Sequence, residues 1–152
     1  MTLSETFLFL HIGAAGIWLG ANIVQIAVPS LSRSEGASFS AGWLRIGAKL
    51  GRVLYMPVGV LLLASGVGLV LTSEGAYEFS DLFVSIGFAV IIIGAVLGAA
   101  VFAPGGFKAA EAFENGDEMT GRATTRRLAG FGALDTILVL FAIVVMILRL
   151  GS

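Results

Sequence analysis

The sequence predicts an all-α integral membrane protein: one domain, residues 1–152, that forms an antiparallel bundle of four transmembrane helices. Of the 152 residues, 57% are hydrophobic and 12% are charged, about half the charged share of a soluble domain. About 20 apolar residues cover the roughly 30 Å of a bilayer core, and only helices satisfy their backbone there. Four windows meet this requirement: residues 3–28, 51–72, 82–103 and 128–148.

The cationic residues predict the orientation of the bundle. They gather in two connections: Arg33, Arg45, Lys49 and Arg52 precede or begin the second span, and Lys108, Arg122, Arg126 and Arg127 lie between the third and fourth spans. The connection between the second and third spans has only acidic charges. Because Lys and Arg in short loops mark the cytoplasmic side, both termini are expected to be extracytoplasmic.

In the first window, the polar side chains fall on one helical face. His11, Trp18, Asn22 and Gln25 lie close to a common line at 100° per residue. We expect this face to point into the bundle. Gly13, Gly16 and Gly20 lie opposite, where they allow packing on a neighbouring helix, which is favoured, or on a second protomer. The window lacks a basic start and a cleavage site, so it is expected to remain as a span.

An amphipathic helix is predicted before the second span, from Ser38 onward. Its apolar face holds Trp43, Ile46, Leu50 and Leu54, and its opposite face holds Arg45, Lys49 and Arg52. This pattern is typical of a helix on the inner membrane surface with its cations near anionic headgroups. In the simpler alternative, the segment only keeps the helix ends at the interface.

Prolines and glycines punctuate the next two spans. Pro57 is expected to bend the start of the second span. Gly87, Gly94 and Gly98 give the third span a small-residue face. The sequence Pro104-Gly105-Gly106 is expected to stop or kink that span, and a short helix over residues 107–115 should end in the turn Asn115-Gly116-Asp117.

Asp135 is the acidic residue that lies deep in a span. Its burial in lipid costs a few kcal/mol unless the carboxylate is paired, hydrated or protonated. Counting the helical rise puts Asn22, Gln25, Tyr55 and Asp135 in the cytoplasmic half, with Arg52 near its rim. We predict a polar cluster in which Asn22 and either Arg52 or Tyr55 contact Asp135. It serves as a proton- or ion-responsive site or as a structural hydrogen-bond clamp, and the clamp is favoured.

His11 lies in the outer half of the bundle and is a possible cofactor ligand. Ser65 reaches a similar level. Haem usually needs a second axial ligand or an open position, and the chain has no other His. By the helical rise, Met146 lies several ångströms closer to the surface than His11, so bis-His ligation would require two protomers. We therefore predict a hydrogen-bonded neutral imidazole and no cofactor, with haem as the alternative.

The composition excludes several function classes. Without Cys there is no disulfide, thiolate metal site or cysteine nucleophile. A net charge of −1 with no basic block argues against nucleic acid binding. No phosphate-binding glycine loop, metalloprotease motif or serine elbow is present. These absences favour a non-enzymatic role and predict no metal site.

Short motifs suggest relatives. Leu10-His11, Trp18-Leu19-Gly20, Ser65-Gly66, Pro104 and the segment from Met146 to Arg149 resemble a bacterial family known as predicted integral membrane proteins of unknown function. The first span is more loosely similar to the copper-resistance membrane domain CopD and the membrane protoporphyrinogen oxidase HemJ. These resemblances imply a bacterial cytoplasmic membrane, and either copper handling or porphyrin chemistry. From the porphyrin-oxidase pattern, only His11 would carry over.

Three hypotheses follow. The first is a transport, channel-like or accessory unit that uses the polar cluster around Asp135. The second is a haem- or porphyrin-binding redox protein that uses His11, with a dimer as one form. The third is a structural subunit of a larger membrane complex. In each, membrane lipids surround the chain, and a homo-oligomer is one possible assembly.

Overall fold

The computed structural model describes residues 1–32 and 34–151, and within them the chain is helical without a strand. Arg33, counted above among the cations, lies outside the described residues. The helical elements are α1 (Leu3–Leu31), α2 (Gly36–Leu50), the π-helical turn η1 (Gly51–Tyr55), α3 (Met56–Thr72), α4 (Leu82–Leu97), the π-helical turn η2 (Gly98–Phe102), α5 (Ala103–Glu114) and α6 (Glu118–Leu148).

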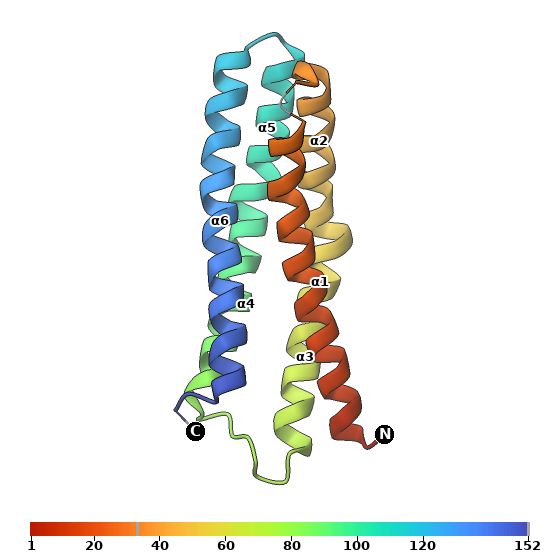
Figure 1. Ribbon diagram of the computed structural model, residues 1–152, viewed down its shortest axis with the longest axis vertical. Coiled ribbons are helices and arrows are strands. Elements are labelled where there is room, and N and C mark those ends of the chain that lie inside the picture. The colour runs from red at the N-terminus through yellow and green to blue at the C-terminus, as the bar shows by residue number, and fades with distance from the viewer. Residues whose placement is uncertain (33, 152) are drawn as a thin grey trace.

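The elements join into four long helices. α2, η1 and α3 form one continuous helix, Gly36–Thr72, and α4, η2 and α5 form another, Leu82–Glu114. With α1 and α6 they make an elongated antiparallel bundle whose two termini lie at the same end (Figure 1). All four helices are long and apolar enough to cross a membrane, which confirms the four predicted apolar helices.

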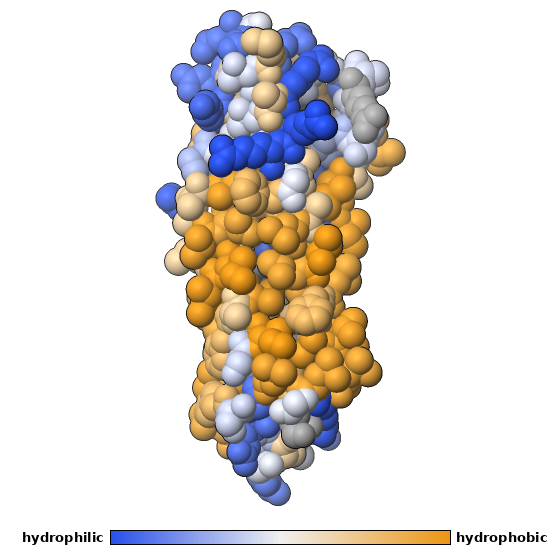
Figure 2. Space-filling view, turned by 90° about the vertical axis from the view of Figure 1, so that its left-hand side faces the viewer, coloured by the Kyte–Doolittle hydropathy of each residue, from blue (hydrophilic) through white to orange (hydrophobic). Residues whose placement is uncertain are grey.

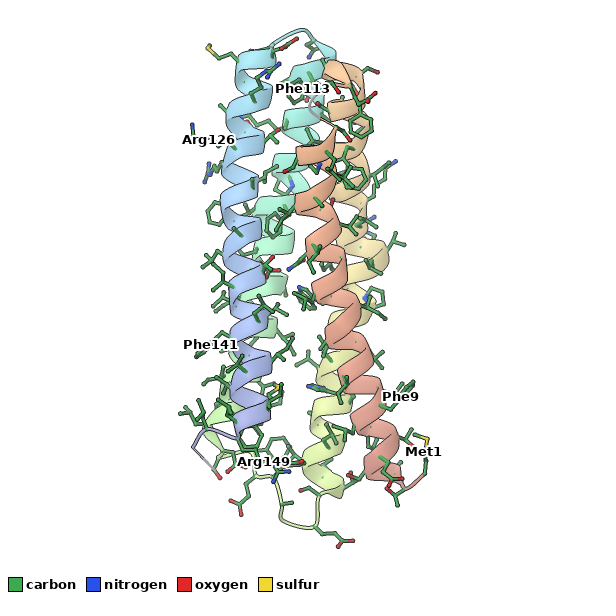
Figure 3. All side chains as sticks on the ribbon, viewed as in Figure 1. Met1, Phe9, Phe113, Arg126, Phe141 and Arg149 are labelled. Carbon is green, nitrogen blue, oxygen red and sulfur yellow. The ribbon has the colours of Figure 1, made fainter. Side chains whose placement is uncertain are left out.

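The bundle is longer than the hydrocarbon core of a bilayer. The 37 residues of Gly36–Thr72 extend for about 55 Å, against about 30 Å of hydrocarbon. An apolar band covers the middle of the molecule and polar side chains cover its ends (Figure 2). The larger polar end, opposite the termini, comprises α2, α5 and residues 118–127 of α6, and is called the polar head below. Arg126 points outward from α6 there (Figure 3).

α2 continues the line of α3 instead of turning off the bundle axis, and it packs lengthwise against α5 (Figure 1). Ala41 of α2 is buried with Ala110 and Phe113 of α5. A Cβ atom placed at Gly106 would lie 3.0 Å from the Ala48 Cβ atom, so the two helices approach closely. The face that α2 buries in the bundle is therefore a stripe of small residues. Of the stripe predicted from larger apolar residues, Leu54 packs against the core, whereas Ile46 is 52% exposed.

In each of the two long helices that contain Pro57 or Pro104, a π-helical turn lies just before the proline. The Met56 N–H group donates to the Gly51 carbonyl, and the Ala103 N–H group donates to the Gly98 carbonyl, each five residues back. Pro57 and Pro104 follow these donors directly. Proline cannot donate a backbone hydrogen bond, and the wider turn keeps the neighbouring groups bonded. The expected stop at Pro104-Gly105-Gly106 is therefore not formed, and the helix continues into α5.

Below the polar head, α1 packs on α3 and α4 packs on α6. The core between these two pairs includes Trp18, Leu62, Val90 and Val139. The glycine face of α1 does not pack inside the bundle. A Cβ atom placed at Gly13, Gly16 or Gly20 would have no described atom within 4 Å apart from its chain neighbours and the nearby backbone of its own helix. The expected intramolecular packing of this face is therefore wrong within the described residues.

Candidate functional site

The candidate site centres on Asp135 of α6, which is 4% exposed. Its Oδ2 atom accepts two hydrogen bonds, from Trp18 Nε1 at 3.1 Å and from Asn22 Nδ2 at 2.8 Å. Its Oδ1 atom is buried and has no hydrogen-bond partner among the described residues. Gly94 of α4 lies beside Oδ1, since a Cβ atom placed there would be 3.3 Å from it. One carboxyl oxygen is thus held by two donors and the other by none.

Asn22 links Asp135 to Tyr55. The Tyr55 hydroxyl donates to Asn22 Oδ1 at 2.8 Å, while the Asn22 amide nitrogen donates to Asp135. The Tyr55 ring also packs edge-to-face on Trp18, with 5.7 Å between ring centroids. The hydrogen-bond chain therefore joins η1, α1 and α6 in one layer of the bundle.

Among the described residues, no cation forms an ion pair with Asp135. The groups that face it are Trp18 and Asn22 from α1 and Gly94 from α4, with Tyr55 behind Asn22. The ion pairs of the described residues, Arg45 with Glu114 and Arg122 with Glu118, both lie in the polar head. Burying a carboxylate without a cation beside it is costly in a low-dielectric environment.

The structure brings together three of the residues expected in the polar cluster: Asn22, Tyr55 and Asp135. Gln25 is half-buried and lies against α2, because a Cβ atom placed at Gly47 would be 3.0 Å from Gln25 Nε2. Trp18 was expected on the inward face of α1 but not as a donor to Asp135. A buried indole N–H group in the middle of a span needs an acceptor, and this requirement could have identified Trp18 as a donor from the sequence.

Arg52 does not join the cluster. Its side chain is exposed and makes no hydrogen bond or ion pair with the residues that the structure describes. In a regular α-helix, residues three apart lie about 60° apart, so Arg52 and Tyr55 would share a face. η1 spans both residues, and its turn holds more residues. The same spacing covers less of a turn there, so Arg52 is rotated away from Tyr55.

His11 is held on α3 in the other half of the bundle. Its Nδ1 atom lies 3.1 Å from Ser65 Oγ and 3.2 Å from the Leu62 carbonyl oxygen. Ser65 Oγ lies only 2.6 Å from the Leu61 carbonyl, to which it donates its own hydrogen. Nδ1 must then be the donor toward Ser65 and Leu62, which leaves Nε2 as the unprotonated nitrogen.

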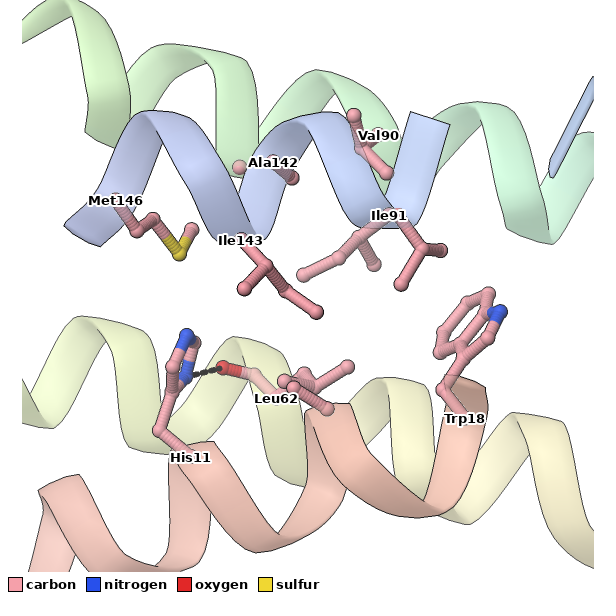
Figure 4. Close-up of a pocket in the computed structure, with 11 residues that line it drawn as sticks. His11, Trp18, Leu62, Val90, Ile91, Ala142, Ile143 and Met146 are labelled. Carbon is pink, nitrogen blue, oxygen red and sulfur yellow. Dashed lines mark hydrogen bonds between the residues drawn. The ribbon is translucent and has the colours of Figure 1, made fainter. Parts of the chain in front are cut away.

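A cavity of about 50 Å³ separates the α1–α3 pair from the α4–α6 pair. His11 and Trp18 line it from α1, and Val90, Ile91, Ala142, Ile143 and Met146 line it from the opposite pair (Figure 4). The His11 ring points across the gap toward Met146 (Figure 4). Met146, expected closer to the surface than His11, lines the same cavity.

The residues around His11 do not fit a haem. Cofactor-sized ligands occupy pockets of about 300 Å³ or more, and this cavity has about 50 Å³. His11 points into the bundle rather than outward toward a second protomer (Figure 4). Within the described part of the chain, no group of three His, Cys, Asp or Glu residues is placed to hold a metal ion.

Comparison with protein-family models, curated proteins and solved structures found no match to this chain. What the site can do therefore follows from its own geometry.

Proposed function

We propose that this chain is a non-enzymatic, multi-pass membrane protein of the transport, channel-like or accessory type, and that Asp135 is the group through which it binds and releases a proton. The proposed location is a bacterial cytoplasmic membrane. Both termini are extracytoplasmic in this proposal, and the polar head is cytoplasmic.

The charge distribution supports this orientation. The polar head and its border with the apolar band contain Lys49, Arg52, Lys108, Arg126 and Arg127, none of which pairs with an acidic side chain in the described residues. Positive charge of this kind belongs on the cytoplasmic side, next to anionic lipid headgroups.

One observation carries the proton-binding proposal: the two oxygens of Asp135 differ in their hydrogen bonds. Oδ2 accepts hydrogen bonds from Trp18 and Asn22, and these bonds persist whether the group is ionised or neutral. Within the described residues Oδ1 has no hydrogen-bond partner and no ion pair, so it is the oxygen to which we assign the proton. The carboxyl group can therefore change charge without losing the contacts that hold it in place.

Infrared difference spectroscopy of the purified protein in lipid vesicles tests the proposal. A protonated carboxylic acid has a C=O stretching band that a carboxylate lacks. We expect a band that changes reversibly with pH in the wild type and is missing in Asp135→Asn. Asn keeps an oxygen that accepts from Trp18 and Asn22, so this variant should remain folded.

Glu114→Gln is the matched control, because it removes a carboxyl group from the polar head and should leave the band intact. A wild-type spectrum without a band that depends on Asp135 at any pH would mean that Asp135 is a fixed structural clamp. The protein would then be a structural or accessory subunit without a proton switch.

A further inference from the structure

We propose that the proton reaches Asp135 from the end of the bundle that holds both termini, through His11 and the cavity between the two helix pairs, with Trp18 as the final barrier. This inference rests on the proposed function and adds the route and the sidedness of proton binding.

His11 has one ring nitrogen that can take part in proton transfer. Its Nδ1–H group donates to Ser65 and Leu62, so Nε2 has a free lone pair on the cavity side. After protonation both nitrogens are donors, and the bonds at Nδ1 stay as they are. The residues packed around it, Gly66, Gly87 and Met146 among them, add no charged group. His11 can therefore gain and lose a proton without rearranging α1 against α3.

The cavity connects His11 to Trp18. They are seven positions apart, which is about 10 Å along α1, and both side chains line the same space. A volume of about 50 Å³ is enough for one or two water molecules, since each takes about 30 Å³ in the liquid. The other lining residues are apolar, and an apolar constriction of this width fills with water only transiently. Proton passage is therefore slow and gated.

Trp18 separates the cavity from the carboxyl group. Its ring lines the cavity, while its Nε1 atom donates to Asp135 Oδ2. A small displacement of the ring would let a hydrated proton reach Oδ1. Transfer then consists of one proton moving from His11 Nε2 through water to Oδ1, with no other bond made or broken.

The opposite approach, from the polar head, is closed by Asn22. Its amide nitrogen donates to Asp135 and its oxygen accepts from Tyr55, so both ends of the side chain are engaged. An amide has no titratable proton near neutral pH. Tyr55 is the titratable group that faces this side of the site within the described residues, and its hydrogen is committed to Asn22.

The experiment follows the Asp135 infrared band after a rapid pH jump, in vesicles sorted by the accessibility of an N-terminal tag. We expect the band to respond faster when the jump is applied at the termini side. His11→Gln keeps a polar group near Ser65 but cannot relay a proton, and it should slow this response by about tenfold or more. The final amplitude should be unchanged. Phe9→Leu, at a position 68% exposed on the same helix, is the matched control and should respond as the wild type does.

A faster response to a jump at the polar-head side, or an unchanged rate in His11→Gln, would overturn the route but leave proton binding by Asp135 intact. Loss of the band itself would overturn the proposed function and the route with it. If His11→Gln does not fold, the sidedness of the wild-type response alone decides between the two approaches.

Discussion

Asn22 donates its amide hydrogen to Asp135 Oδ2 at 2.8 Å, and this bond joins the first long helix to the last. The same side chain accepts a hydrogen bond from Tyr55, at the end of η1. Three of the four long helices therefore meet through one amide group, and α4 approaches the same layer through Gly94.

Asn22→Leu should destabilise the bundle more than Tyr55→Phe does. Leu at position 22 removes a donor from Asp135 and the acceptor of Tyr55, and each buried group left without a partner costs about 1–3 kcal/mol. Phe at position 55 removes only the hydroxyl, for about 1 kcal/mol. The free energy of unfolding in detergent micelles measures both, and the lipid-facing change Ile23→Leu is the control. Equal losses in the two variants would contradict the bridging role of Asn22.

Gly94→Ala should be destabilising and Gly16→Ala should not. A Cβ atom at Gly94 would lie 2.6 Å from Trp18 Cζ2 and 3.3 Å from Asp135 Oδ1, whereas the corresponding atom at Gly16 meets nothing within 4 Å. Overpacking of this kind costs about 1–3 kcal/mol, and the change at Gly16 should stay within about 0.5 kcal/mol. Thermal unfolding of both variants in the same detergent tests the difference. A Gly94→Ala protein as stable as the wild type would refute the close approach of Trp18 to α4.

Asp117 should make the start of α6 sensitive to acid. Its side chain accepts a hydrogen bond from the Thr120 backbone N–H group at 3.0 Å. This bond lowers the pKa of Asp117 below its ordinary value. Because the folded-state pKa is the lower one, the carboxylate stabilises the cap at neutral pH and loses this effect as the pH falls through that pKa.

Hydrogen-exchange protection of the first turn of α6 measures the effect of Asp117. It should fall in acid for the wild type and stay constant in Asp117→Asn, because Asn caps a helix without titrating. Identical pH profiles for the two proteins would assign the acid sensitivity to another group.

Haem should not bind through His11. The cavity of about 50 Å³ is too small for the macrocycle. We expect the purified protein to lack a Soret band, and added haemin to give the same difference spectrum with the wild type and with His11→Gln. A Soret shift that appears in the wild type and disappears in His11→Gln would establish His11 as an axial ligand.

The sequence was sufficient to predict the four apolar helices, because length and hydropathy decide which segments cross a bilayer. It was also sufficient to expect Asn22, Tyr55 and Asp135 in one layer, since helical rise fixes depth wherever the helix is regular. Depth alone did not reveal the partners of Asp135. The Trp18 donor depends on how α1 is rotated against α6, and this rotation is a property of the packed bundle.

The errors arose where local geometry departs from an ideal α-helix. At Arg52, a π-helical turn changed the angle between side chains that the sequence places three residues apart. At α2, two apolar stripes compete, and the stripe of small residues is buried because Gly106 of α5 allows backbone contact.

The π-helical turns at Gly51 and Gly98 also matter for movement. Each wider turn holds one residue more than a regular one, and such a residue can be passed along a helix without breaking its continuity. If such a turn moves by one residue, the part of the helix on one side of it rotates by about 100° and shifts by about 1.5 Å along the axis. Tyr55 is the last residue of the first of these turns, so such a rotation would withdraw its hydroxyl from Asn22.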